Sequence, residues 1–176
     1  MGHWSRYIAA GVLMMLHAGA QAATALGEIN IEMSGNIVDF TCVAEGNDSD
    51  KVVTLGTWPT KQLRTTGSRT QPMPFTLKLT GCPPGAASIT FSGKADGSDS
   101  GLLALNDGST AGQVAVEIRD ADKTRLDLQQ ASQPVTVDAE GNAVLSFYAN
   151  YIATADNPQP GRADADATFM INYNYC

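Results

Sequence analysis

The sequence predicts an all-β protein, and three observations support this fold class. Short runs in which apolar and polar residues alternate recur along the chain, which is the pattern of half-buried strands. Loops rich in Gly, Pro, Asp and Ser separate these runs, and the chain holds 17 Gly and 8 Pro in 176 residues. No stretch of useful length has the spacing of an amphipathic helix. Evenly spaced short strands with polar turns indicate a sandwich or a barrel.

The first 22 residues have the pattern of a secretory signal peptide. Arg6 supplies the positive charge, residues 8–16 form a short apolar core, and residues 20–22 read A-Q-A, an A-x-A cleavage site. The mature chain is therefore expected to begin after Ala22 or Ala23. The apolar run is too short for a permanent membrane anchor, and no second long apolar run follows it. We expect export without insertion into a membrane.

Residues 26–40 read as a strand with one apolar face, close to the start of the mature chain. Five alternate positions share that face: Ile29, Ile31, Met33, Gly35 and Ile37. No hairpin turn and no partner strand precede this segment. The alternation alone fits the first strand of an ordinary sandwich, and it also fits a strand that docks into another molecule.

Six further runs alternate in the same way and are expected to be strands. They are residues 52–55, 75–82, 89–91, 114–118, 145–151 and 169–175. Residues 102–105 fit either a short helical turn or a strand fragment. The mature chain of about 150 residues is the size of one domain, which is long enough to bury a sizeable core.

The composition argues against an enzyme and against a metal site. His3 and His17 both lie in the signal segment, so the mature chain has no imidazole for a catalytic triad or for a zinc or copper site. The Asp-rich spots lack the calcium-loop pattern. A net charge of −7 with scattered Lys and Arg offers no footprint for nucleic acid. We expect no catalytic residue, no metal, no cofactor and no nucleic-acid partner.

Three cysteines remain in the mature chain: Cys42, Cys82 and Cys176. An oxidising compartment favours disulfides between such residues. A bridge between the first two would close a loop of about 40 residues, worth roughly 4 kcal/mol in the chain-entropy model. The odd cysteine of a secreted protein pairs between molecules or stays free, and for Cys176 the free thiol is favoured.

Several segments, taken in order, resemble subunits of chaperone–usher pili of the type 1 fimbrial family. Residues 35–42 read GNIVDFTC and resemble the family segment that runs from an N-terminal extension into the first cysteine. Residues 74–82 read PFTLKLTGC and resemble the strand that ends at the second cysteine. Residues 91–120 follow the middle of the family, and residues 147–154 and 161–173 resemble its C-terminal signature. The ordered set covers essentially the whole mature chain.

This resemblance implies an immunoglobulin-like β-sandwich that is incomplete and is completed by a strand donated from another chain. Residues 23–38 would be the donor-strand extension, with the apolar face described above as its contact side, and residues 39–176 would be the pilin domain. Gly35 corresponds to a family glycine that meets a shallow part of the groove, where a Cβ would clash. The resemblance also implies that Cys42 and Cys82 form the disulfide.

The same resemblance implies three kinds of partner. A periplasmic chaperone lends a strand to the groove, and at the outer-membrane usher the extension of a neighbouring subunit replaces it, which is β-augmentation. The chaperone and groove contacts are expected at Gly161, Phe169, Ile171, Tyr173 and Tyr175. Tyr173 and Tyr175 share the same parity along the strand, so either fits the tyrosine that the chaperone recognises.

The implied function is structural, in a fimbria that is exported through the periplasm to the cell surface and supports cell adhesion. A shaft pilin and a minor adaptor or terminator both fit, and the short extension with residues 102–105 slightly favours an adaptor. The alternative is a free-standing secreted β-sandwich that binds, for example, a carbohydrate. Such a module would use residues 26–40 in its own sheet.

Overall fold

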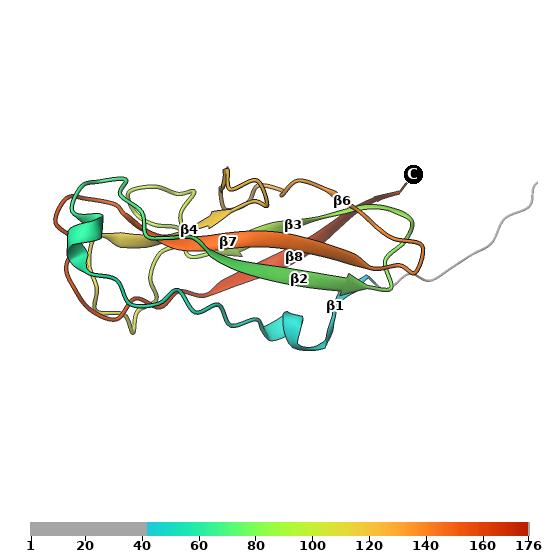
Figure 1. Cartoon of the computed structure of the whole chain (residues 1–176), viewed down its shortest axis with the longest axis horizontal. Helices are drawn as coiled ribbons and strands as arrows, with labels where there is room; N and C mark the ends of the chain where they lie inside the picture. Colours follow the sequence, from blue (N-terminus) through green and yellow to red (C-terminus); the bar gives the residue numbers. More distant parts are fainter. Residues whose placement is uncertain (1–41, 176) are drawn as a thin grey trace, which may run out of the picture. The chain divides into compact units, whose positions relative to one another are not determined.

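The computed structural model describes residues 42–175, whose regular elements are almost all strands joined by long loops (Figure 1). The strands are β1 (Val43–Ala44), β2 (Met73–Thr80), β3 (Gly85–Gly93), β4 (Val114–Arg119), β5 (Arg125–Leu126), β6 (Val135–Thr136), β7 (Ala143–Ala153) and β8 (Ala167–Tyr175). Two short 3-10 helices are η1 (Gly46–Asp50) and η2 (Thr60–Leu63). The prediction of an all-β fold is confirmed.

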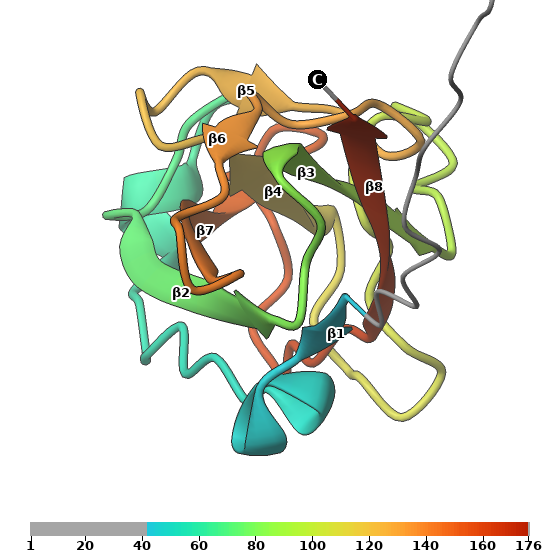
Figure 2. The same ribbon diagram turned by 90° about the vertical axis from the view of Figure 1, so that its right-hand side faces the viewer.

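The strands form two antiparallel sheets that face each other. The five-stranded sheet has the order β1-β2-β7-β4-β5, and the three-stranded sheet has the order β6-β3-β8. Seen end-on, β2 and β7 lie on one side of the domain and β3 and β8 on the other (Figure 2). Alternation places Leu77 of β2, Leu145 of β7 and Ile89 of β3 on the inward faces, where all three are fully buried. The core therefore lies between the two sheets.

Three phenylalanine rings join the sheets at the centre of this core. Phe75 of β2 lies opposite Phe147 of β7, and their ring centroids are 5.6 Å apart. Phe91 of β3 meets Phe147 edge-on at 5.0 Å. Aromatic pairs of this kind contribute about 0.5–1.5 kcal/mol beyond the area that they bury. The cluster therefore fixes the distance between the sheets.

On one side of the sandwich the chain itself joins the two sheets, through residues 127–134, which we call the crossover. The N–H of Gln129 donates to the carbonyl oxygen of Phe91 (2.9 Å), and the N–H of Ser132 donates to that of Ile89 (2.8 Å). In return, Ser132 Oγ accepts the N–H of Ile89 (2.9 Å). The apolar side chains buried on or beside the crossover are Leu126, Leu128 and Val137.

Residues 52–55, predicted as a strand, are not one. No backbone-to-backbone hydrogen bond joins residues 52–57 to another described residue, and the carbonyl oxygen of Leu55 accepts only the indole N–H of Trp58 (2.6 Å). The helix η1 precedes this segment, and its Asp48 accepts the N–H of Lys78 through Oδ2 (2.7 Å). The carboxylate of Asp48 thus takes the place of the backbone carbonyl that a further strand would offer to the edge of β2. The pairing of β1 with β2 ends at this point, and the prediction of a strand at residues 52–55 was wrong because of this contact.

Residues 102–105 form neither a helix nor a regular strand. Leu103 instead makes two isolated bridges, one to Ala95 and one to Val116, and in the second each N–H donates to the other residue's carbonyl oxygen at 2.9 Å. This bridge extends the five-stranded sheet beyond β4 by one residue. The strand fragment was therefore the better of the two alternatives.

Cys42 and Cys82 form a disulfide with an S–S distance of 2.09 Å, which is the pairing that the resemblance implied. The bridge ties the residue before β1 to the loop after β2. The signal segment, the donor-strand positions Ile29, Ile31, Met33, Gly35 and Ile37, and Cys176 lie outside the described residues. The predictions made for them stay predictions.

Candidate functional site

A groove of about 1300 Å³ opens along β8, at the edge of the three-stranded sheet that lies away from β6 and the crossover. Residues 163–171, which include the first half of β8, form one wall, and residues 49–57 form the other. The floor is the core itself. The side chains that line it are Phe75, Leu77, Phe91, Leu103, Val116, Ile118, Ala149 and Tyr151.

Small residues in the first wall explain why the groove reaches the core. The segment leading into β8 alternates alanine with aspartate, and Ala163, Ala165 and Ala167 occupy every second position. Ala165 packs against the core, and a methyl group fills little of the space above the floor. The alternation of small apolar and charged residues therefore leaves a channel that is apolar at its base.

Both walls have backbone edges that take no part in a ladder within residues 42–175. β8 pairs with β3 on one side, and no described strand pairs with its other side. Residues 52–57 likewise make no backbone-to-backbone hydrogen bond to a described residue. Edges of this kind offer a row of N–H and C=O groups to a further strand, and the floor offers apolar pockets for its alternate side chains. The groove therefore combines two edges without a described partner strand and an apolar floor, which are the features that an added extended strand needs.

Two of the expected contact residues line this groove. Phe169 and Ile171 lie in its wall and pack, partly buried, against the core. Tyr173 follows on the same face of β8, outside the lining, with 40% of its surface exposed. The backbone of Tyr175 pairs with Gly85 at the end of the strand. The structure thus brings Phe169 and Ile171 together at the groove.

Gly161 lies elsewhere, in the loop before the first wall. A Cβ on this glycine would lie 2.5 Å from the backbone nitrogen of Ala111 and 2.5 Å from Thr110 Oγ1. The glycine is needed because two loops approach each other closely at this point. Its expected role in chaperone contact stays a prediction.

The sequence reasoning missed most of the groove's walls. Residues 49–57 were partly read as an ordinary strand, and residues 163–167 were not singled out as site residues. The signal for the second segment was present, because alanine recurs at period two directly before the apolar alternation of β8. The first segment gave no comparable signal, because its position follows from the Asp48 contact with β2.

Tyr151 lies at the floor where β8 begins. Its hydroxyl donates to the carbonyl oxygen of Ala163 (2.6 Å). Burial raises the pKa of Tyr151, and the nearby charge of Asp164 raises it further. The phenol is therefore neutral and acts as a hydrogen-bond donor that ties the floor to the wall.

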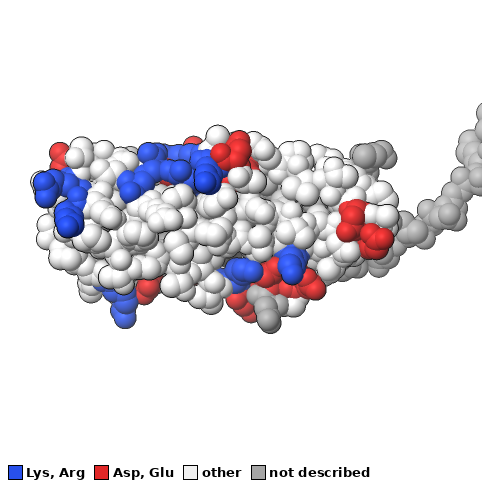
Figure 3. Space-filling model, viewed as in Figure 1, with Lys and Arg blue, Asp and Glu red and all other residues white. Residues whose placement is uncertain are grey.

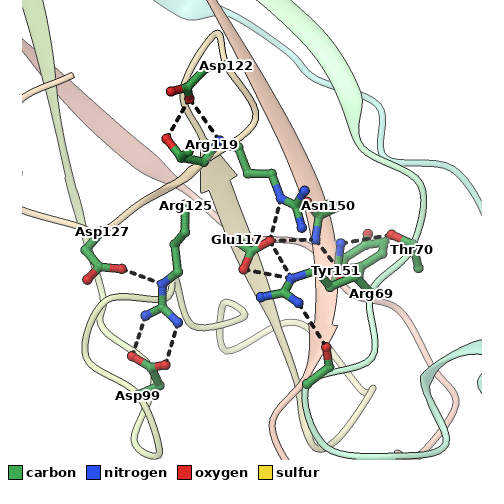
Figure 4. Close-up of polar contacts among 12 residues, drawn as sticks. Arg69, Thr70, Asp99, Glu117, Arg119, Asp122, Arg125, Asp127, Asn150 and Tyr151 are labelled. Atoms are coloured by element: carbon green, nitrogen blue, oxygen red, sulfur yellow. Dashed lines mark hydrogen bonds and ion pairs between the residues drawn. The ribbon is translucent and has the colours of Figure 1, made fainter. Parts of the chain in front are cut away.

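A charged cluster lies on the outer face of the five-stranded sheet, away from the groove (Figure 4). Glu117 accepts from Arg69 Nε at 2.9 Å, from Arg119 Nε at 2.7 Å and from Asn150 Nδ2 at 3.3 Å. Burial disfavours the charged carboxylate, but the hydrogen bonds from the two arginines outweigh this and hold the pKa of Glu117 below its usual value. The cluster links β4, β7 and the segment before β2, which is a structural role.

A second ion-pair cluster ties a loop to the domain (Figure 4). Arg125 donates to Asp99 through Nη1 at 2.8 Å and through Nη2 at 2.6 Å, and it also pairs with Asp127. These bonds hold the pKa of Asp99 below its usual value. Across residues 42–175, neither these carboxylates nor others gather into a group that could hold a metal ion. In that same range, no helix has the length and apolar character needed to cross a membrane.

Comparison with known proteins gives consistent relatives. The sequence model of the family "Fimbrial protein" matches residues 31–174. Fimbrial-like protein FimF of Salmonella typhimurium strain LT2 is 61% identical over 155 residues, which cover 88% of this chain and 90% of that protein. A solved type I fimbria protein of Burkholderia pseudomallei is 29% identical, with a TM-score of 0.59 over 77% of this chain and 91% of that one. A chain in a chaperone–usher pilus structure, at 21% identity, shares the fold with a TM-score of 0.63 over 86% of this chain and 98% of that one.

Proposed function

The chain belongs to the family of fimbrial proteins, and we propose that its groove receives an extended strand donated by another subunit of the same fibre. It is a structural subunit of a bacterial surface fimbria with an immunoglobulin-like fold, and the free-standing binding module is not favoured. The observation that carries the proposal is the groove itself. It exposes core residues between two edges that no described strand occupies.

The donated strand would be the N-terminal extension of the next subunit, and residues 23–38, by which this chain would plug into a preceding subunit, serve as the example of such a strand. Its alternate side chains, Ile29, Ile31, Met33 and Ile37, would fill the floor of the groove, and Gly35 would meet its shallow part. Burying one such side chain is worth roughly 1.5–3 kcal/mol. Four of them would contribute about 6–12 kcal/mol before the cost of ordering the arm, against a typical domain stability of about 5–15 kcal/mol. The strand is therefore a major part of the fold.

Before assembly, a periplasmic chaperone would hold the groove, and the exchange would take place at an outer-membrane usher. Phe169 and Ile171 support this, because they present an apolar edge beside unpaired backbone that a chaperone strand could occupy. Tyr173 and Tyr175 continue the same strand. We propose a structural role in adhesion and no catalytic one, with an adaptor-like position in the fibre.

An added donor strand should raise the melting temperature of the mature chain strongly. The fused chain carries residues 25–39 again after residue 176, through a flexible linker, with Cys176→Ser in both the fused and the unfused chain. We expect the fused chain to be a monomer with a much higher melting temperature, because the floor residues become buried and both edges become paired. Size-exclusion chromatography and thermal melts measure the two properties.

A matched control tests whether the apolar face is responsible. In the control, only the appended copy carries Ile31→Ser and Met33→Ser, so the length of added chain is unchanged. It should lose most of the gain, and Gly35→Leu in the appended copy should lose part of it. Equal melting temperatures for all versions, with the unfused chain already stable and monomeric, would mean that the sandwich is complete without a donor.

A further inference from the structure

The edge of β2 that faces away from β7 is only partly paired, although residues 52–57 run near it. β1 pairs with one end of this edge, and the N–H of Glu45 donates to the carbonyl oxygen of Lys78 (2.8 Å). Alternate residues of an antiparallel strand direct their backbone groups to the same side. Pro74, Thr76 and Lys78 therefore share this edge, which we call the outer edge of β2.

Asp48 ends the pairing on the outer edge by an exchange of hydrogen-bond partners. In a continued ladder, the carbonyl oxygen of Glu45 would accept the N–H of Lys78. That oxygen instead accepts the N–H of Asp48 (2.7 Å), and Asp48 Oδ2 accepts the N–H of Lys78 (2.7 Å). The exchange satisfies both backbone groups, and the chain turns away from β2 into η1.

The carboxylate of Asp48 is fixed in this position. Acidic and basic side chains lie side by side on the surface around η1 (Figure 3), and Asp48 Oδ1 pairs with Lys51 Nζ at 2.7 Å. The hydrogen bonds from Lys51 and from the N–H of Lys78 hold the pKa of Asp48 below its usual value. The group is therefore an ionised acceptor, and hydrogen bonds to ionised acceptors are stronger than those between neutral groups.

A proline blocks the next part of the outer edge. The ring of Pro74 replaces the N–H that would point outward, so this position cannot donate to a further strand. Residues 51–54 face residues 73–76 across a gap of about 360 Å³. Thr76 does carry an N–H on this edge, but residues 52–57 make no backbone-to-backbone hydrogen bond with it. The two segments therefore lie near each other without pairing.

Side chains hold residues 52–57 in place instead of a backbone ladder. Leu55 packs against the core, and its carbonyl oxygen accepts the indole N–H of Trp58 (2.6 Å). Val52, in contrast, is 87% exposed. The segment is thus positioned beside the groove while its backbone N–H groups have no acceptor in the backbone of the described residues.

We propose that Asp48 and Pro74 are positioning residues, which keep residues 52–57 off the outer edge of β2 so that their backbone stays available to the donated strand. Two neighbouring segments with unpaired N–H and C=O groups are otherwise prone to pair. The inference rests on the proposed function, because it assigns these residues a role only in the entry of a strand into the groove.

The two pairings of residues 52–57 exclude each other. Neighbouring strands of a sheet lie about 4.8 Å apart, whereas stacked sheets lie about 10 Å apart. A segment paired with β2 would join the five-stranded sheet, whereas a strand beside β8 would join the three-stranded sheet. On β2, residues 52–57 would therefore be too far from the donated strand to share its hydrogen bonds.

Binding of a labelled peptide of residues 25–39 to the unfused mature chain with Cys176→Ser tests the role of Asp48. Fluorescence anisotropy measures the binding. Asp48→Ala should weaken it by about tenfold or more, because only the fraction of molecules with residues 52–57 off β2 is then competent to bind. Asp48→Asn should bind more tightly than Asp48→Ala, since its amide oxygen still accepts the N–H of Lys78.

Glu45→Ala is the matched control. It removes another carboxylate, three residues before Asp48, whose side chain makes no capping hydrogen bond to η1 and does not line the groove. The backbone groups of residue 45 that take part in the exchange remain. This variant should bind the peptide like the parent.

Amide hydrogen exchange of the unfused chains separates the proposed role from a general loss of order. In Asp48→Ala, the N–H of Thr76 should exchange more slowly than in the parent, because it then pairs with residues 52–57. Pro74→Thr tests the same idea with the Asp48 contact intact. It returns an N–H to the outer edge and should also weaken peptide binding and slow exchange at Thr76.

Two results would overturn the inference alone, in a parent that binds the peptide. One is an Asp48→Ala variant that binds as tightly as the parent. The other is an N–H of Thr76 that exchanges faster in this variant, which would mean that the substitution only loosens the edge. A parent that binds no peptide would overturn the proposed function and this inference with it.

Discussion

The two long sides of the sandwich differ in how the sheets are joined. On the crossover side, backbone and side-chain hydrogen bonds connect residues 127–134 to β3, and Leu128 is buried beneath them. On the groove side, residues 52–57 make no backbone-to-backbone hydrogen bond to a described residue, and Phe169 and Ile171 are only partly buried. The chain itself therefore closes one side of the sandwich. On the other side, two strand-like edges border an apolar groove in which no described strand lies.

This difference separates the part of the folding free energy that the chain supplies itself from the part that a donated strand would supply. The core is continuous from one side to the other, since Phe91 and Phe147 belong to the same cluster as Leu128, and Phe169 packs against that cluster. A strand added at the groove would contact residues of the open side and not Leu128 of the closed side, so its effect on a substitution should be larger on the open side. Substitutions on the two sides separate these effects.

Leu128→Ala on the closed side should have the largest effect. Its side chain is 7% exposed, and removing a buried leucine side chain costs about 2–5 kcal/mol because of lost burial and the cavity left behind. The loss should be the same in the fused and the unfused chain, since Leu128 does not line the groove. Urea unfolding of both chains measures it. A loss that changes by more than about 1 kcal/mol on fusion would mean that the two sides are coupled.

Ile171→Ala on the open side should have an effect that depends on the donor strand. In the unfused chain the residue is partly exposed at the groove wall, so the loss should be about 1–2 kcal/mol. In the fused chain the same side chain becomes buried, and the loss should approach that of a core substitution, about 2–4 kcal/mol. The same urea series measures the difference. Equal losses in both chains would argue that the appended strand does not reach Ile171.

Much of the closed architecture could be predicted from the sequence, because alternation decides the faces of a strand. The runs at 114–118, 145–151 and 169–175 fall within β4, β7 and β8. Alternation fails at residues 52–55, where the Asp48 side chain displaces the backbone ladder. Such a contact between distant residues leaves no periodic signal.

The groove shows the same limit. The alternation predicted that Phe169 and Ile171 lie in a strand, the family resemblance implied that they line a groove, and the structure places them in its wall. That the sandwich needs a donated strand came from the family resemblance, since counting strands in a sequence is too imprecise to reveal a missing one. The opposite wall depends on packing between distant segments, which no local pattern records.

Glu117→Gln should have a smaller effect than Leu128→Ala, and its effect should be the same with and without the donor strand. Glu117 lies on the outer face of the five-stranded sheet, away from both sides compared above, where Arg69 and Arg119 donate to it. Replacing the carboxylate by an amide weakens hydrogen bonds to charged groups that are worth roughly 1.5–3 kcal/mol each, and glutamine keeps part of them. We expect a loss of about 1–3 kcal/mol at pH 7.

The pH dependence of this loss follows from the sign of the pKa shift. The folded-state pKa of Glu117 is held below its usual value, so the unfolded chain binds the proton more readily. The stabilisation is therefore complete above the unfolded pKa of about 4.3 and is lost as the pH falls through the lower, folded pKa. The difference in unfolding free energy between parent and Glu117→Gln should be constant from pH 7 to about 5.5 and should shrink below about pH 4. A difference that grows on acidification would reverse the assigned direction, and one that changes when the donor strand is appended would place Glu117 within the reach of the groove.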